Sequence, residues 1–282
     1  MSILPEPEPD DDETTVAARV GLVRLYDQIA PTYGTALDLL DVFGRDLVVA
    51  ADISRGERVL DIGCGRGACL RPALEAVGQD GYVLGIDMSP AMVALLGQEL
   101  QHEGITNARA LLGDAERLDL ADEPFDAMTC GFVVHHFLNL TATLKRCRQL
   151  LRPGGRLASS TFADGTLDFP WVLEVLEETV LHAPIRDRSA TIMLTAPELA
   201  QAMTAAGFGS VVTTTQERRF VFADVRAYMT WVRAQGLGTF INRLKPPELQ
   251  RFEDGCERRL AFHRSRDGYE LLKSVDLTVA AE

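Results

Sequence analysis

Three aspartates, each at the end of a short apolar run, are the residues of this chain best suited to chemistry. Asp61 stands two residues before the glycine-rich turn Gly63–Gly67, and Asp87 and Asp114 end two later runs. A glycine turn lets a ligand lie directly against backbone N–H groups, because glycine adopts positive φ and has no Cβ. The carboxylates and the turn together predict a binding site for a ligand rich in hydrogen-bond donors.

The details of this turn distinguish between cofactors. Dinucleotide-binding proteins use G-x-G-x-x-G, whereas this turn reads G-x-G-x-G, and the carboxylate of Asp61 would repel a pyrophosphate but suit an amino group. Asp87 has the spacing of a ribose-binding acid, and an exocyclic amine such as that of adenine suits Asp114. An amino group, a ribose and an adenine describe S-adenosylmethionine. A nicotinamide oxidoreductase, the competing interpretation, is disfavoured.

The elements that position these residues follow from hydrophobic periodicity. Residues 16–51 show helical spacing, and Arg58–Phe162 reads as strand, helix, strand, helix, strand, strand, helix, strand, which predicts a doubly wound α/β sheet. Pro72 requires a helix to start close to the glycine turn. Further along we predict a helical run Trp171–Leu181, a helix Pro197–Ala206, a strand Val211–Thr215, a helical and aromatic insertion between Phe222 and Asp267, and a last strand Tyr269–Val279.

Five segments in this order resemble the class I S-adenosylmethionine-dependent methyltransferases, in the branch of ubiquinone and menaquinone biosynthesis enzymes and antibiotic-tailoring methyltransferases. They are Tyr26–Tyr33, Val59–Gly67, the run ending at Asp87, Gly113–Glu116 with Phe125-Asp126, and His135-His136 followed by Leu151–Gly155. The resemblance implies a Rossmann-like sheet of seven strands with the last strand antiparallel. It also implies a methyltransferase of the EC 2.1.1 class that uses S-adenosyl-L-methionine and releases S-adenosyl-L-homocysteine.

The resemblance further implies which residues bind the cofactor. Asp61 and the glycines would hold the methionine moiety, Asp87 the ribose, and Asp114 the adenine amino group. The full predicted set is Tyr33, Asp61, Gly63, Gly65, Gly67, Asp87, Met88, Asp114, Ala115, Cys130 and Gly131.

The periodicity also predicts a single methyltransferase domain over residues 16–282, behind a disordered acidic tail at 1–15. Its core would comprise 45–162, 196–215 and 268–280, and a substrate lid would comprise 16–44, 163–195 and 216–267. Val225, Tyr228, Met229 and Val232 recur at one-face helical spacing, which favours packing over substrate contact. The candidate substrate-binding residues are Tyr26, Trp171 and Trp231, and the aromatic content of the lid favours an apolar substrate.

Methyl transfer from a sulfonium mainly requires that nucleophile, methyl group and sulfur be aligned in a dry site. A general base is needed only for a nucleophile that arrives protonated. The candidates are His135 and His136, with a slight preference for His135, because neutral imidazole accepts protons near pH 7. A purely structural role for this pair remains the competing interpretation.

Composition narrows the possible partners. The net charge of −13, without a lysine or arginine cluster, argues against a nucleic-acid partner. The five cysteines form no metal-binding or disulfide pattern, which predicts reduced, mostly buried thiols and no metal. The start of the chain has neither a signal peptide nor a membrane anchor, so a cytoplasmic location is expected. A homo-oligomer is left open.

Two functions are therefore predicted. The first is an S-adenosylmethionine-dependent methyltransferase acting at O, N or C of a small organic molecule, in secondary metabolite (antibiotic) biosynthesis. The second is a cyclase of the same fold that binds S-adenosylmethionine without transferring its methyl group, because fold alone does not fix function.

Overall fold

An eight-stranded sheet organises the computed structural model, which describes residues 13–118, 120, 124–163, 171–182, 194–234 and 237–281. The strands run in the order β3-β2-β1-β4-β5-β8-β6, and β7 pairs with β8 beside this path. Their bounds are β1 Arg58–Ile62, β2 Tyr82–Asp87, β3 Ala108–Leu112, β4 Phe125–Gly131, β5 Leu151–Phe162, β6 Ser210–Phe222, β7 Arg264–Ser265 and β8 Gly268–Ala281.

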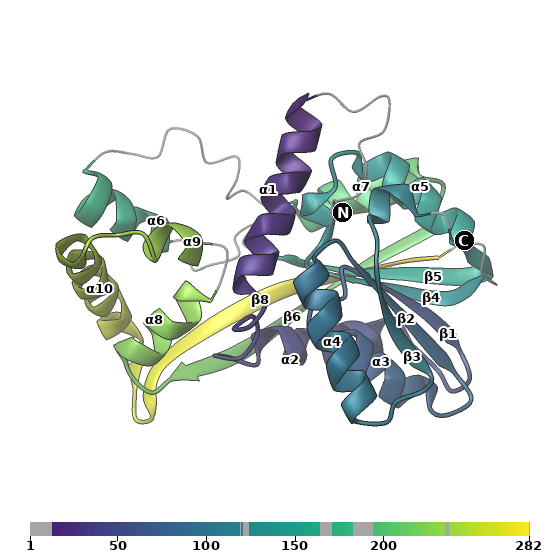
Figure 1. Ribbon diagram of the computed structural model, residues 1–282, viewed down its shortest axis with the longest axis horizontal. Helices are drawn as coiled ribbons and strands as arrows, with labels where there is room; N and C mark the ends of the chain where they lie inside the picture. Colours follow the sequence, from purple (N-terminus) through teal and green to yellow (C-terminus); the bar gives the residue numbers. More distant parts are fainter. Residues whose placement is uncertain are drawn as a thin grey trace.

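Ten α-helices accompany the sheet in the part of the chain described (Figure 1). They are α1 Glu13–Ile29, α2 Leu39–Ala50, α3 Leu70–Val77, α4 Pro90–His102, α5 Leu140–Leu150, α6 Trp171–Leu176, α7 Ala196–Ala205, α8 Val225–Arg233, α9 Gly238–Ile241 and α10 Pro246–Leu260. Short 3-10 turns at Ala115–Arg117, Val134–His136 and Ala261–His263 and a π-turn at Glu177–Leu181 complete the elements.

The sheet has the predicted topology. Strands β1 to β5 pair in parallel, and β8 is antiparallel to both β5 and β6. The chain reverses its direction of winding between β1 and β4, and in sheets of this kind ligands bind at the carboxyl ends of the strands beside such a switch point. The prediction of a doubly wound sheet with an antiparallel last strand is confirmed.

Alternate residues of the parallel strands supply two separate cores, one on each face of the sheet. Leu60 and Ile62 of β1 pack in a cluster with α5 and α7, whereas Val59 packs in a cluster with α3 and α4. Because helices cover both faces, β1 and β4 are buried along almost their whole length instead of alternating between buried and exposed residues. This burial fixes the register that brings the carboxyl ends of the strands together.

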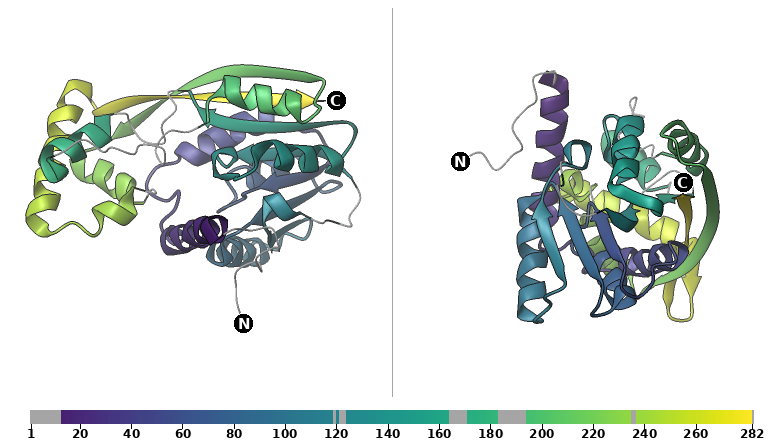
Figure 2. Two further views of the ribbon diagram at one scale, coloured as in Figure 1. Left: turned by 90° about the horizontal axis from the view of Figure 1, so that it is seen from above. Right: turned by 90° about the vertical axis from the view of Figure 1, so that its right-hand side faces the viewer.

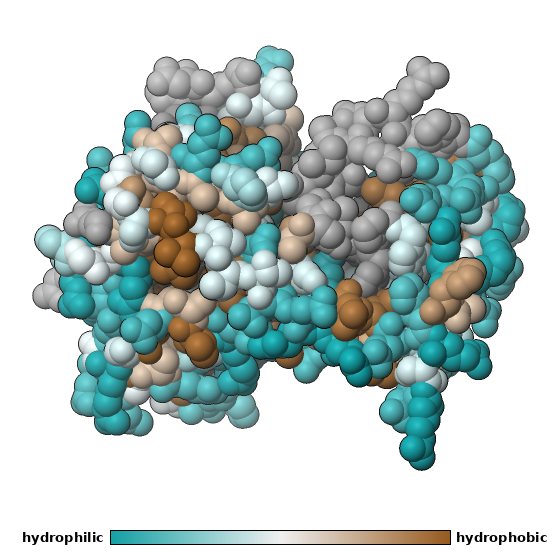
Figure 3. All heavy atoms as spheres, turned by 180° about the vertical axis from the view of Figure 1, so that it is seen from behind, coloured by the Kyte–Doolittle hydropathy of each residue, from teal (hydrophilic) through white to brown (hydrophobic). Residues whose placement is uncertain are grey.

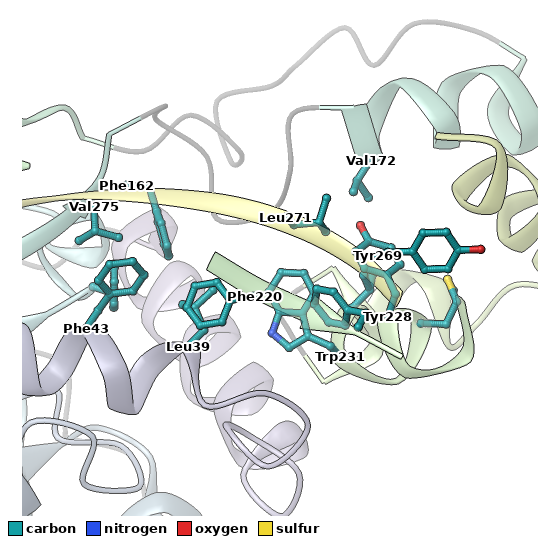
Figure 4. Close-up of a cluster of buried hydrophobic side chains, with 14 of the residues drawn as sticks. Leu39, Phe43, Phe162, Val172, Phe220, Tyr228, Trp231, Tyr269, Leu271 and Val275 are labelled. Atoms are coloured by element: carbon teal, nitrogen blue, oxygen red, sulfur yellow. The ribbon is translucent and has the colours of Figure 1, made fainter. Parts of the chain in front are cut away.

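Strands β6 and β8 continue well beyond the rest of the sheet as a long two-stranded ribbon (Figures 1 and 2). At its far end lie α6, α8, α9 and α10, which we call the distal helices. A third hydrophobic cluster follows this ribbon, from Phe43 and Phe162 near the sheet to Tyr228 and Trp231 at the distal helices (Figure 4). The distal helices are thus attached through a continuous apolar core.

Element boundaries differ from the sequence predictions at a few places. Helix α1 begins at Glu13, inside the predicted tail, and β6 continues past Thr215 to Phe222. The second difference arises because β6 is an edge strand, so its middle carries charged, exposed residues that hide the strand pattern, while pairing with β8 extends it to Phe222. The predicted helical run from Trp171 is confirmed, as α6 followed by the π-turn.

The molecular surface is mostly hydrophilic on the face seen in Figure 3, and the cysteines are buried as the sequence predicted. Seen from behind, most of the molecular face is hydrophilic, with hydrophobic residues in small patches (Figure 3). All five cysteines are buried and free. No helix among the described residues has the length and apolarity needed to cross a membrane. Residues 1–12 of the predicted tail, and residues 164–170 and 183–193 of the first insertion, lie outside the described part of the chain.

Candidate active site

A cavity of about 330 Å³ lies at the carboxyl ends of β1 to β5. Its walls come from α1, the start of α2, the glycine turn after β1, and the loops that follow β2, β3 and β4. Helix α1 stands between the sheet and the distal helices, across this end of the molecule (Figure 1). The cavity is therefore built where a doubly wound sheet is expected to bind its ligand.

Asp61 is the most deeply buried acid of the cavity, with 2% of its surface exposed. Its Oδ1 accepts a hydrogen bond of 2.7 Å from Thr129 Oγ1, while the buried Oδ2 accepts none from the described residues. Burial raises the pKa of this carboxyl to about 7, opposed by the Thr129 hydroxyl and, to a smaller extent, by the Leu70 amide, with nearby Asp87 adding to the rise. Such an oxygen suits a positively charged amino group, because burial makes an unpaired carboxylate costly.

Asp87 joins the glycine turn to the end of β2. Its Oδ2 accepts the Gly65 N–H at 2.8 Å and its Oδ1 accepts the Ser89 N–H at 2.8 Å. Burial raises the pKa of Asp87, and these two amides oppose the rise. Gly65 has a φ of +50°, which side chains adopt only with strain, so glycine is required where the carboxylate holds the turn. Each carboxylate oxygen keeps a lone pair for a hydroxyl donor.

Asp114 lies at the opposite end of the cavity and is held from two sides. Its Oδ1 accepts the Glu116 N–H at 2.9 Å, and its Oδ2 lies 3.2 Å from Nε of Arg19 on α1. The second contact is an ion pair whose geometry does not make it a hydrogen bond. Burial is the main cause of the raised pKa of Asp114, which the Arg19 charge opposes.

The pair His135-His136 lies in the 3-10 turn after β4, and His136 contacts α1 through Tyr26. Nε2 of His136 is 2.8 Å from the hydroxyl of Tyr26, and the rings of His135 and His136 are 4.0 Å apart. Burial lowers the pKa of His135 to about 3, with His136 adding to the effect, and lowers the pKa of His136 to about 4. Both imidazoles are therefore neutral at pH 7. Burial also raises the pKa of Tyr26, so this phenol stays protonated beside His136.

Helix α1 is tied to the loops of the site along its length. Besides the contacts of Arg19 and Tyr26, Oδ1 of Asp27 accepts hydrogen bonds from Ser89 Oγ at 2.5 Å and from the Ala91 N–H at 3.0 Å. Tyr33, just after α1, lies over the glycine turn, 3.9 Å from the position of a Cβ on Gly65. Every loop that bears a predicted cofactor residue thus has a neighbour from this amino-terminal segment.

The structure brings most of the sequence-predicted site residues together. The cavity is lined by Tyr26, Tyr33, Asp61, Gly63, Gly65, Asp87, Met88, Asp114, Ala115, Gly131, His135 and His136. Their individual roles remain predictions.

Four predicted residues lie elsewhere. Gly67 packs against Leu96 of α4, and Cys130 points into the core between the sheet and α5. Trp231 is 3% exposed and packs on Phe222 and Tyr228, and Trp171 stacks on Tyr228 with ring centroids 5.5 Å apart. The tryptophans therefore belong to the core of the distal helices, because their rings cover neighbouring rings there.

Arg19 and Phe132 are two of the cavity residues that were not identified from the sequence. Arg19 lies seven residues before Tyr26 on α1, and this helical spacing was the available signal. Phe132, directly after β4, has a φ of +57°, a strained value for an aromatic residue that costs roughly 1–3 kcal/mol. No pattern in the sequence predicts a positive φ at Phe132.

The donors and acceptors of the cavity fit S-adenosylmethionine. The unpaired Oδ2 of Asp61 suits the amino group, Asp87 the ribose hydroxyls, and Asp114 the adenine amine. Among the described residues, no group of three or more histidines, cysteines and acids has the arrangement of a metal site.

Comparisons with known proteins relate this chain to methyltransferases. The family described as "Methyltransferase domain" matches residues 59–155. Aklanonic acid methyltransferase DauC of Streptomyces sp. (strain C5) is 37% identical over 151 residues, which are 52% of this chain and 69% of that protein. Nocamycin O-methyltransferase of Saccharothrix syringae is 28% identical over 237 residues, 79% of this chain and 84% of the relative.

A solved structure resembles nearly the whole chain. The crystal structure of the [4+2]-cyclase SpnF aligns with a TM-score of 0.56 at 20% sequence identity, over 98% of each chain. At this identity the likeness is one of fold.

Proposed function

Because the chain belongs to the class I S-adenosylmethionine-dependent methyltransferases, we propose that it methylates an oxygen atom of a small secondary metabolite. The names of two relatives support this finer assignment, since one acts on aklanonic acid and the other is an O-methyltransferase. Secondary metabolism is the context that the sequence motifs predicted.

The observation that carries our assignment of the cofactor site is the buried, unpaired Oδ2 of Asp61. When bound, S-adenosylmethionine supplies an electrophilic methyl group on a sulfonium. In our proposal the Asp61 carboxylate binds the amino group, Asp87 binds the ribose, Asp114 binds the adenine amine, and the Gly65 turn leaves space for close approach. Tyr33 and α1 exclude water, which strengthens these charged contacts.

We further propose that the acceptor is an oxygen already ionised at neutral pH, such as a carboxylate. The argument rests on the histidines of the cavity, whose lowered pKa values make them poor proton acceptors for an alcohol or phenol. A carboxylate needs no base, so His135 and His136 would serve as neutral hydrogen-bonding groups. The substrate of the relative named for aklanonic acid is likewise an acid.

The test uses a matched pair of acceptors that share one ring system, 2-naphthoate and 2-naphthol. The protein is incubated with S-adenosylmethionine and each compound between pH 6 and 8, and S-adenosylhomocysteine and methylated product are measured by mass spectrometry. With S-adenosylmethionine saturating at every pH, we expect methyl 2-naphthoate, formed at a rate that does not fall toward pH 6. Methylation of 2-naphthol without 2-naphthoate, or a rate that rises tenfold per pH unit, would contradict a carboxylate acceptor.

The cyclase alternative makes the opposite prediction for the cofactor. The likeness to SpnF concerns fold, whereas the two relatives described above are named as methyltransferases. S-adenosylhomocysteine released in a 1:1 ratio with product supports methyl transfer. Product formed while S-adenosylmethionine remains intact supports a cyclase.

A further inference from the structure

Phe132 connects the cavity to the core that supports the distal helices. It follows Gly131 at the end of β4, lines the cavity, and is 9% exposed in the cluster that runs along β8. Among the described residues, it is the one aromatic side chain that belongs to both the cavity lining and this cluster. Phe132 follows β4, which pairs with β1, so it lies on the side of the cavity where we propose that Asp61 binds the methionine moiety, whereas Asp114 follows β3 at the other edge of the parallel strands.

Two aromatic rings of the same hydrophobic cluster pack against the ring of Phe132. It stacks on Phe162 with centroids 4.3 Å apart and planes 16° from parallel, and Phe43 meets it edge-on at 6.2 Å. The buried ammonium of Lys273 lies 4.6 Å from the centre of the Phe162 ring. Figure 4 shows Phe43 and Phe162 side by side where this cluster meets the sheet. A ring supported in this way is a rigid, flat, apolar wall.

The backbone at this position argues that the ring itself matters. The φ of +57° turns the chain so that Val133 packs against Gly63, where a Cβ on Gly63 would come within 2.3 Å of Val133 Cγ2. Glycine would make the same turn without strain. The chain nevertheless places its aromatic ring at a strained residue of the site, and such strain accumulates at functional positions.

We propose that Phe132 is a specificity-determining residue, whose ring forms the wall against which a planar, conjugated acceptor lies. The proposal rests on the proposed function, because it places the acceptor beside the methionine end of the cofactor. A flat acceptor gains stacking with the ring over its whole area, whereas a saturated ring system of the same size meets the wall with only a few hydrogens.

The test measures binding of 2-naphthoate and of its saturated counterpart decahydro-2-naphthoate to the full chain saturated with S-adenosylhomocysteine, by calorimetry. We expect wild-type protein to bind 2-naphthoate at least tenfold more tightly than the saturated acid. F132L should lose this preference to within twofold, while the Kd for S-adenosylhomocysteine changes less than twofold. Equal binding of the two acids by the wild type, or an undiminished preference in F132L, overturns the proposal.

Two further variants separate recognition from stability. F43L removes a ring of the same cluster that does not line the cavity, so it should lower the melting temperature but keep the naphthoate preference. F132H keeps a planar ring and tolerates the left-handed backbone better, so it should keep at least half of the preference even if F132L folds poorly. Loss of the preference in F43L would show that the ring of Phe132 acts only through packing. Failure of wild-type protein to bind S-adenosylhomocysteine would contradict the proposed cofactor site instead.

Discussion

The cavity and the distal helices both contain buried side chains, but these side chains differ in how they are paired. Around the cavity, acids such as Asp61 are buried with an unpaired oxygen, glycines adopt positive φ, and Phe132 is strained. At the distal helices, Tyr228 and Trp231 of α8 are buried among other rings, including that of Phe222. The first region presents many groups that suit a ligand, whereas the second is filled by the packing of its own side chains. Burial by itself therefore does not distinguish a binding residue from a structural one.

The largest predicted effect is a loss of stability without loss of cofactor binding. W231A removes a ring that is 3% exposed, and we expect it to lower the free energy of unfolding by roughly 3–5 kcal/mol. The Kd for S-adenosylhomocysteine should change less than twofold, because Trp231 lies outside the cavity. Urea denaturation and calorimetry measure the two quantities. F262A, which truncates a ring that is 86% exposed, is the control and should be nearly neutral.

At Asp61 we expect a loss of cofactor affinity without a loss of stability. D61N removes the carboxylate that we assign to the cofactor's amino group, so affinity for S-adenosylmethionine should fall on the order of 100-fold, about 2.7 kcal/mol. Stability should stay equal or rise, because a buried carboxyl with a raised pKa is replaced by a neutral group. The matched control is D126N. Asp126 is also buried, but it accepts the Arg58 N–H at 2.6 Å, far from the cavity, so its loss should cost stability and leave affinity unchanged.

Asp61 also predicts how affinity and stability depend on pH. In the free protein its pKa is about 7, above the ordinary 3.8, so the folded state favours the protonated form. The stability that this contributes is fully present below about pH 4 and is lost as the pH rises through 7. Binding of the amino group requires the ionised form, so affinity should rise about tenfold between pH 6 and 8. Calorimetry across this range checks the rise, and D61N should abolish it.

The smallest predicted effect concerns the contact between α1 and the adenine end of the cavity. R19A removes the ion pair with Asp114, and we expect affinity for S-adenosylhomocysteine to fall roughly fivefold, since partly buried pairs contribute about 1 kcal/mol. Proteolysis within α1 should become faster at the same time. R24A, an exposed residue of the same helix, is the control. Equal behaviour of the two variants would mean that Arg19 does not hold α1 over the site.

The glycine turn and the acids near it could be predicted from the sequence, whereas residues whose neighbours are set by tertiary packing could not. The glycine turn and the acids Asp61, Asp87 and Asp114 have sequence patterns because the φ angles and strand-end positions require particular residue types. Trp231 was predicted to face a substrate because it lies off an apolar stripe. In the structure other rings surround α8 on that side too, so the stripe understated how much of the helix is buried.

The amino-acid sequence by itself determined the doubly wound sheet and the set of acids at its carboxyl edge, because each depends on local periodicity and on residue types with one suitable conformation. The antiparallel last strand was implied by the resemblance to the methyltransferase family. The tertiary structure alone decided which side chains share the cavity. Arg19 reaches Asp114 over 95 positions, and Phe132 reaches Phe162 through the pairing of β4 with β5. Such contacts depend on how helices and strands pack, and no local pattern in the sequence records them.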